Sequence, residues 1–110
     1  MKISDFAAGI GAEVLTMPEP DAVVSGGYCG DLLSWVMGRA NAGNIWITIM
    51  SNINTVAVAS LADVSAILLS ENAEIEESVV TKAEEQGINV LRTKMTTYEA
   101  ALALGELLKG

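Results

Sequence analysis

Three short polar segments follow apolar runs in this sequence, where a parallel sheet would place a ligand. They are Thr48 to Asn54, Ser70 to Asn72 and Arg92 to Thr96. Ligands of open parallel sheets gather beyond the carboxyl ends of the strands, at helix N-termini with free N–H groups. The first and third segments offer hydroxyl and backbone groups that could hold a small anion. Every helix start needs such residues as caps, so capping is the simpler interpretation of each segment alone.

The most distinctive segment runs from Ser25 to Asp31 and reads Ser-Gly-Gly-Tyr-Cys-Gly-Asp. Its glycines permit positive φ and a close approach to a ligand or another chain. It is not a phosphate-binding loop, because the sequence contains neither G-x-x-x-x-G-K-[ST] nor G-x-G-x-x-G. A tightly packed turn from strand to helix is one interpretation. The other is a concave ligand site in which seven residues converge, namely Ser25, Gly26, Gly27, Asp31, Thr48, Asn52 and Asn54.

The residue types needed for most catalysis are scarce. The sequence has no histidine, which removes the commonest general base and the commonest metal ligand. Its single cysteine, Cys29, can form neither an intrachain disulfide nor a cysteine metal cluster, and we interpret it as a buried core residue. Acidic residues between Glu74 and Glu85 are typical of a solvated helix face rather than a cation site. We therefore predict no catalytic residue, no metal and no cofactor.

Composition and charge narrow the class of protein. The 110 residues suit one domain, expected over residues 1–110. Hydrophobic residues make up 51% of the chain, which is enough for a core that needs no disulfide bond or metal to stabilise it. The net charge is −8, and the six basic residues are scattered, which argues against nucleic acid and against an anionic membrane surface. The apolar region Thr55 to Leu69 contains Ser60, Asp63 and Ser65, so it is not a membrane span. With no signal-peptide pattern at the start, we expect a cytoplasmic protein.

Apolar runs alternate with amphipathic stretches, which predicts the elements that must position these residues. Strands are expected over Glu13–Thr16, Ala22–Tyr28, Ile45–Met50, Ser65–Ser70 and Ile88–Arg92. Helices are expected over Asp5–Gly11 with Ser4 as N-cap, Leu32–Met37 with Asp31 as N-cap, Ile53–Leu61, Glu74–Gln86, and from the capping box Thr96-x-x-Glu99 to Lys109. This order predicts an α/β fold with a small, largely parallel sheet flanked by helices.

The segment Asp21-Ala22-Val23-Val24-Ser25-Gly26-Gly27 resembles the motif that names the DRTGG domain family. The resemblance continues through Gly30–Leu33, Ile45–Ile49, Asn54–Leu61 and Glu84–Leu91. Nearly the whole chain is therefore covered. Ala22 stands where the family name has arginine, and Ser25 replaces threonine, so any ligand role of that arginine cannot be carried over to this chain.

The resemblance implies a fold similar to the N-terminal domain of HPr kinase/phosphorylase. In that enzyme a separate C-terminal domain holds the ATP-binding machinery, and this sequence lacks its phosphate-binding loop. Elsewhere the family domain lies between CBS domains of a regulated inorganic pyrophosphatase and contributes to dimerisation. Stand-alone copies are similar to accessory or regulatory proteins of bacteria.

We accordingly expect a non-catalytic regulatory or assembly module that acts through homodimerisation and protein contacts. The nearly all-apolar helix Thr55 to Leu61 and the apolar residues Trp35, Met37 and Met50 motivate this expectation, because such surfaces often mark association.

Two alternatives stay open at this stage. The first is a sensor of a nucleotide or anionic metabolite, held by the seven residues named above. The second is an enzyme that works through Asp31, Lys94, Tyr98 or Cys29, for which the spacing of these residues gives no support.

Overall fold

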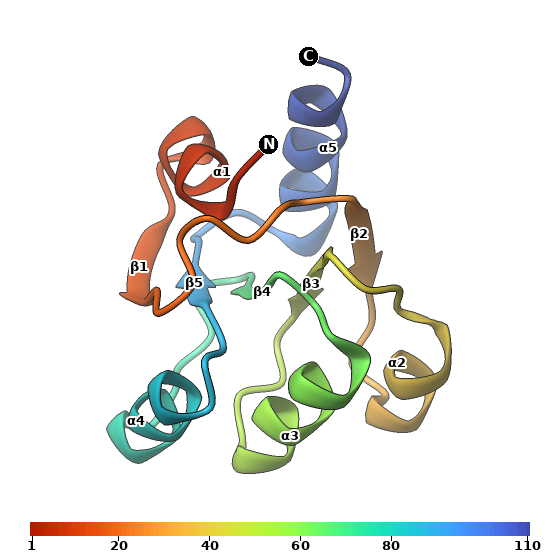
Figure 1. The fold of residues 1–110 in the computed structure, drawn as a ribbon. Coiled ribbons are helices and arrows are strands. Elements are labelled where there is room, and N and C mark those ends of the chain that lie inside the picture. The colour runs from red at the N-terminus through yellow and green to blue at the C-terminus, as the bar shows by residue number, and fades with distance from the viewer.

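A computed structural model describes residues 1–110, which form one five-stranded sheet between two layers of helices (Figure 1). The strands are β1 (Glu13–Thr16), β2 (Gly26–Cys29), β3 (Asn44–Thr48), β4 (Ala66–Leu69) and β5 (Val90–Arg92). The helices are α1 (Ile3–Ile10), α2 (Leu33–Arg39), α3 (Ile53–Ala62), α4 (Glu77–Glu85) and α5 (Thr97–Leu108). In Figure 1, α1 and α5 lie above the sheet, and α2, α3 and α4 lie below it.

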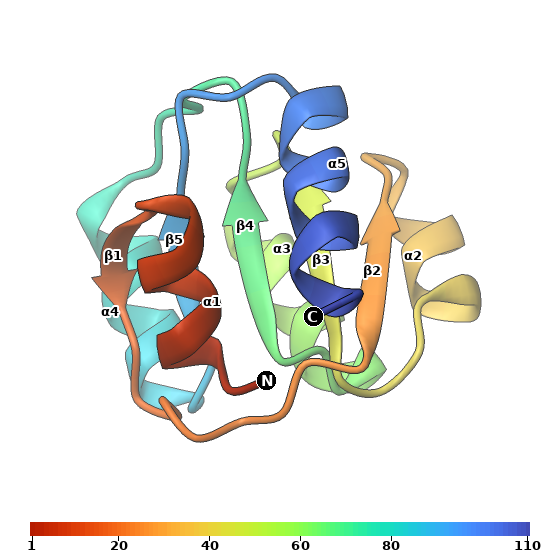
Figure 2. The same ribbon diagram turned by 90° about the horizontal axis from the view of Figure 1, so that it is seen from above.

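The strands are arranged in the order β1-β5-β4-β3-β2, and only β1 runs antiparallel to its neighbour. The α/β fold with a largely parallel sheet is thus confirmed. Figure 2 looks onto the α1 and α5 side, where β2 forms one edge of the sheet and β1 the other. The carboxyl ends of the four parallel strands meet along one end of the sheet, as the sequence predicted.

The central strands separate two apolar layers. All residues of β3 and β4 are buried, as expected for parallel strands covered on both faces. Trp46, Ile67 and Val90 pack with α2, α3 and α4, whereas Ile45 and Leu68 pack with α1 and α5. None of the helices is long and apolar enough to cross a membrane.

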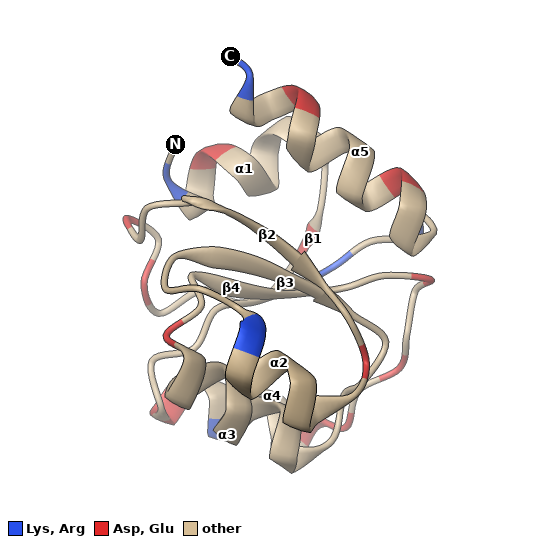
Figure 3. Cartoon of the chain, turned by 90° about the vertical axis from the view of Figure 1, so that its right-hand side faces the viewer, with Lys and Arg blue, Asp and Glu red and all other residues tan.

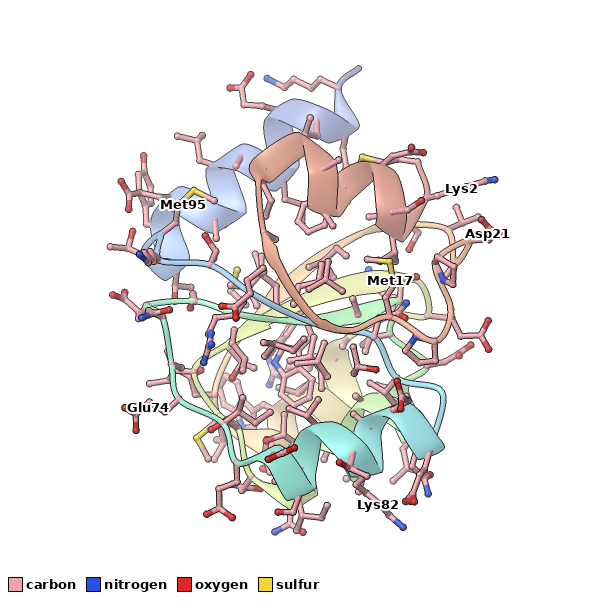
Figure 4. All side chains as sticks on the ribbon, turned by 90° about the vertical axis from the view of Figure 1, so that its left-hand side faces the viewer. Lys2, Met17, Asp21, Glu74, Lys82 and Met95 are labelled. Atoms are coloured by element: carbon pink, nitrogen blue, oxygen red, sulfur yellow. The ribbon has the colours of Figure 1, made fainter.

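The first helix begins earlier than the sequence predicted. Its N-cap is Lys2, and Ser4, the predicted cap, lies within the first turn. Lys2 is held in place by a bridge to Val23 and by an ion pair with Asp21, with 3.4 Å between Nζ and Oδ1 (Figure 4). The earlier start buries the side chain of Ile3 completely. Lys2 also has a local partner, since its N–H group donates to Asp5 Oδ2 over 3.4 Å, but the contacts with Asp21 and Val23 come from residues far along the chain.

The second strand is shorter than predicted. Of the expected range Ala22–Tyr28, only the glycine-rich end lies in β2, which extends to Cys29. The N–H group of Val24 donates to the carbonyl oxygen of Met1 over 2.8 Å. The first half of the predicted strand therefore pairs with the N-terminus instead of with β3.

A single buried amide ties the proline-containing loop to the sheet. Asn89 is 1% exposed, and its Oδ1 accepts the N–H of Glu19 over 2.9 Å. Its Nδ2 donates to the carbonyl oxygens of Glu19 and Ser65 over 2.8 and 2.9 Å. Asn89 thus uses both ends of its amide to join three segments of the chain.

We expect Asn89→Ala to lower the free energy of unfolding by about 2 kcal/mol, because it leaves the buried carbonyl of Ser65 and the loop backbone unpaired. Denaturant titration of the purified protein measures this change. The matched control is Asn54→Ala on an exposed position, expected to shift stability by no more than about 0.5 kcal/mol. Equal effects of the two variants would contradict the structural role of Asn89.

Candidate functional site

The carboxylate of Asp31 joins the chain segments that leave β2 and β3. Thr48 is fully buried, and its Oγ1 donates to Asp31 Oδ1 over 2.8 Å. The N–H group of Ile49 donates to the same oxygen over 3.0 Å. The prediction that Asp31 caps α2 is wrong, because the neighbouring strand engages its carboxylate and Leu32 takes the cap position without a side-chain bond.

Asn52 occupies the N-terminus of α3. Its Oδ1 accepts the N–H groups of Asn54 and Thr55 over 2.9 and 3.3 Å. Asn52 is therefore a helix cap, and Asn54 is exposed in the first turn. An anion at this helix start would have to displace the amide oxygen of Asn52.

The N-terminus of α5 is also satisfied within the chain. Thr96 and Glu99 form the predicted capping box, with bonds of 3.1 and 2.9 Å. Glu71 Oε2 accepts the N–H of Thr97 over 3.4 Å, and Ser70 Oγ lies 2.7 Å from Thr97 Oγ1. A carboxylate of the loop after β4 thus already stands where an anion would bind.

Ser25 and Gly26 lie at the opposite, amino end of the sheet. The N–H group of Ser25 donates to the carbonyl oxygen of Gly43, and its Oγ donates to that of Ala42, both over 2.9 Å. Gly26 lies opposite Asn44, the first residue of β3. Because β2 runs parallel to β3, residues that precede the strand cannot meet residues that follow it.

Gly27 lies under α5, in the middle of β2. A Cβ atom at this position would overlap Leu104 Cδ2, so the missing side chain is what lets α5 approach the strand. The seven predicted residues therefore do not converge on one pocket. Asp31, Thr48, Asn52 and Asn54 share the carboxyl end of the sheet, and the Ser25 to Gly27 segment is built into the other end and the α5 contact.

Cys29 is exposed, and its interpretation as a core residue is wrong. The cysteine lies on the edge strand β2, which has a neighbour on one side only. Partial burial beside α5 raises the pKa of the thiol, and the negative charge of Asp31 raises it further. The thiolate form needed for nucleophilic attack is thus disfavoured at neutral pH.

The largest groove of the molecule lies between the start of α3 and α4. It has a volume of about 690 Å³ and includes Ser51 and Asn52 in its lining. Three carboxylates and one ammonium group surround it, from Glu74, Glu76, Glu85 and Lys82. Glu74 and Lys82 both point away from the body of the protein (Figure 4). This balance of charge disfavours an anion in the groove.

A smaller pocket of about 250 Å³ lies at the carboxyl end of β5. The basic side chains of Arg92 and Lys94 line it, together with Glu13 and Asn72. Arg92 Nε and Nη2 donate to the two carboxylate oxygens of Glu13 over 3.0 and 3.1 Å. These bonds lower the pKa of Glu13 and raise the pKa of Arg92. The sequence indicated Arg92 and Lys94 as part of a candidate anion site. It did not indicate Glu13, because nothing in the local sequence of β1 or β5 predicts that these two strands pair in antiparallel orientation.

The family model of the DRTGG domain matches residues 5–107. The chain therefore belongs to the DRTGG domain family. No curated protein matches it.

A similar solved structure contains the CBS and DRTGG domains of the regulatory region of Clostridium perfringens pyrophosphatase, in complex with its activator diadenosine tetraphosphate. The TM-score is 0.70 at 15% sequence identity, and the match covers 94% of the present chain and 45% of that one. At this identity the likeness concerns the fold. The present chain spans less than half of the length of that structure.

We expect Gly27→Ala to destabilise the protein by about 1 to 3 kcal/mol, since the new methyl group must displace Leu104 and with it α5. The control is Gly38→Ala near the end of α2, where an added Cβ meets open space. Thermal unfolding followed by circular dichroism measures both variants. A Gly27→Ala protein as stable as the wild type would show that close packing is not the role of this glycine.

Proposed function

We propose that this chain is a regulatory module that acts by contact with a second copy of itself and performs no catalysis. The observation that carries the proposal is the exposure of large apolar side chains on three helices. They are Leu32 at the N-cap of α2, Trp35 and Met37 on α2, Leu61 on α3, and Tyr98, Leu102 and Leu108 on α5. Such surface often marks association. The DRTGG domain of the similar pyrophosphatase structure lies in a regulatory region, which supports a regulatory role here.

The hydrogen bonds of the polar side chains support a non-catalytic role. The side chains of Asp31, Thr48 and Asn52 bond to neighbouring groups of the chain, as the caps of α5 do. The pKa shifts of Glu13 and Arg92 come from their own ion pair, and the raised pKa of Cys29 comes mainly from burial, so none of these three shifts marks an activated acid or base. We also propose a cytoplasmic location, because a reducing compartment keeps an exposed thiol such as Cys29 reduced.

We expect the purified chain to form a homodimer, which light scattering coupled to gel filtration would detect as twice the chain mass. Concentrations from about 1 to several hundred micromolar cover the range in which modest interfaces assemble. A strict monomer throughout this range would overturn the proposal of self-association.

A second candidate function is the sensing of a nucleotide or another anionic metabolite. The pocket beside Arg92 favours it, because Lys94 and Arg92 bring two of the six basic residues of the chain together at the carboxyl end of β5. The similar pyrophosphatase region binds a nucleotide activator, which also supports this candidate. Glu13 neutralises part of the charge, so Lys94 is the cation left for a phosphate group.

If this second function holds, adenosine triphosphate or diadenosine tetraphosphate will raise the melting temperature, and Lys94→Ala will weaken the response at least tenfold in apparent affinity. The matched control is Lys82→Ala on α4, which removes the same charge far from the pocket and should bind like the wild type. Failure of both nucleotides to stabilise the wild type would count against nucleotide sensing.

A further inference from the structure

One side of α5 is apolar and uncovered. Ala100 and Leu104 face the sheet, and Leu107 packs beside Gly9 of α1. The uncovered side, here termed the α5 stripe, consists of Tyr98, Ala101, Leu102, Gly105 and Leu108. Ala101 and Leu102 lie three and four residues after Tyr98, Gly105 lies four and three residues after them, and Leu108 follows three residues later, so these positions share one side of the helix. Tyr98 is 75% exposed and Leu102 is 54% exposed.

Gly105 has no function inside the chain. It lies in the last third of α5, where glycine weakens a helix relative to alanine. A Cβ atom added to Gly105 would meet nothing within 4 Å, so no contact of the folded chain requires the missing side chain. Gly27 and Gly9 differ in this respect, since a Cβ atom at either would press on a leucine of α5. Gly38 on α2 also has open space around it, and Gly105 differs in that it lies within the α5 stripe and lines a groove beside β2.

A groove adjoins the α5 stripe on the side of the open sheet edge. It has a volume of about 200 Å³ and lies between β2 and α5, lined by Gly27 and Cys29 of β2 and by Gly105 and Leu108 of α5. No strand pairs with the outer edge of β2, so no neighbouring strand covers this side of the groove. Figure 3 looks at this edge, with α5 above β2.

The charges on α5 suit a second copy of the same helix in antiparallel orientation. Glu99 lies near the start of α5 and Lys109 directly follows its end. Antiparallel pairing about a point near Gly105 places the Lys109 of each copy close to the Glu99 of the other. The stripe itself carries no acid. Glu99 and Glu106 lie on one flank of α5, and a crossing at Gly105 also brings the two Glu106 residues near each other, so the antiparallel order gives two attractive Lys109–Glu99 contacts against one repulsive contact. A parallel arrangement would instead bring like charges together.

We propose that two copies of this chain dock through their α5 stripes, antiparallel and with the two Gly105 residues at the crossing point. Leu102 and Leu108 of each copy then pack on either side of the crossing and into the groove beside β2. A twofold interface requires such a self-complementary surface, with the protruding leucines and the glycine gap on the same helix. This inference rests on the proposed self-association and names its surface.

The apolar residues of α2 form a weaker candidate for the same role. The guanidinium of Arg39 lies 3.9 Å from the centroid of the Trp35 ring and stacks on it. This contact covers one face of the largest exposed side chain of α2 and leaves a positive charge beside it. The α5 stripe has no comparable cover.

Gly105→Ala tests the α5 interface, because we expect it to stabilise the monomer and to weaken the dimer. Alanine should raise the melting temperature measured at the lowest protein concentration, since it strengthens α5 where space is open. The same methyl group at the crossing point should raise the dimer dissociation constant at least tenfold, measured by analytical ultracentrifugation. Gly38→Ala, the control on α2, should strengthen its helix and leave the dissociation constant unchanged.

Lys109→Glu tests the antiparallel orientation, because it places two acids together at each end of the pair. We expect weaker dimerisation at low salt and recovery as added salt screens the repulsion. Lys82→Glu changes the net charge equally on the remote helix α4, and it should leave the dissociation constant unchanged.

The outcomes separate the two proposals. A wild-type chain that stays monomeric overturns self-association and this interface together. A wild-type dimer whose dissociation constant Gly105→Ala and Lys109→Glu leave unchanged overturns the α5 interface alone. A Gly105→Ala monomer that melts below the wild type would also overturn it, because Gly105 would then have a function inside the chain.

Discussion

The burial of β3 and β4 on both faces is the constraint on which the rest of this molecule depends. No position in these two strands faces solvent, so helices must cover both sides of the sheet and the chain must cross over between parallel strands. Polar side chains that could bind or react are thereby confined to the two ends and the two edges of the sheet. Every functional question about this domain concerns one of these boundaries.

At the carboxyl end of the sheet, the chain satisfies its own polar groups. Asp31 accepts bonds from the end of β3, Asn52 caps α3, and Glu71 reaches the start of α5. In many α/β proteins a bound anion takes such helix starts, because the N–H groups there carry partial positive charge. Here internal oxygen atoms take that place. The arrangement stabilises the fold, and the outer edge of β2, with α5 beside it, is left without a neighbouring strand.

Much of the fold could be predicted from the sequence, because each signal was local. Alternating apolar runs marked all five strands, and the capping box at Thr96 marked the start of α5. The errors came from contacts between segments far apart in the chain. Asp31 accepts a bond from Thr48 instead of capping α2, and Lys2 rather than Ser4 is the N-cap of α1. Cys29 is exposed because β2 lies at an edge of the sheet.

The sequence by itself determined what this protein has to work with: an apolar core for a layered sheet, no histidine, one thiol, and glycines that predict close approach somewhere. Only the tertiary structure decided where these residues act. Two glycines show the difference, since Gly27 makes room for Leu104 within the chain, whereas the space beside Gly105 is empty. In the sequence both positions are simply glycine, and nothing there distinguishes the two roles. The packing of α5 over β2 determines that the fold uses the first glycine for a close contact, whereas the second makes no such contact within the chain.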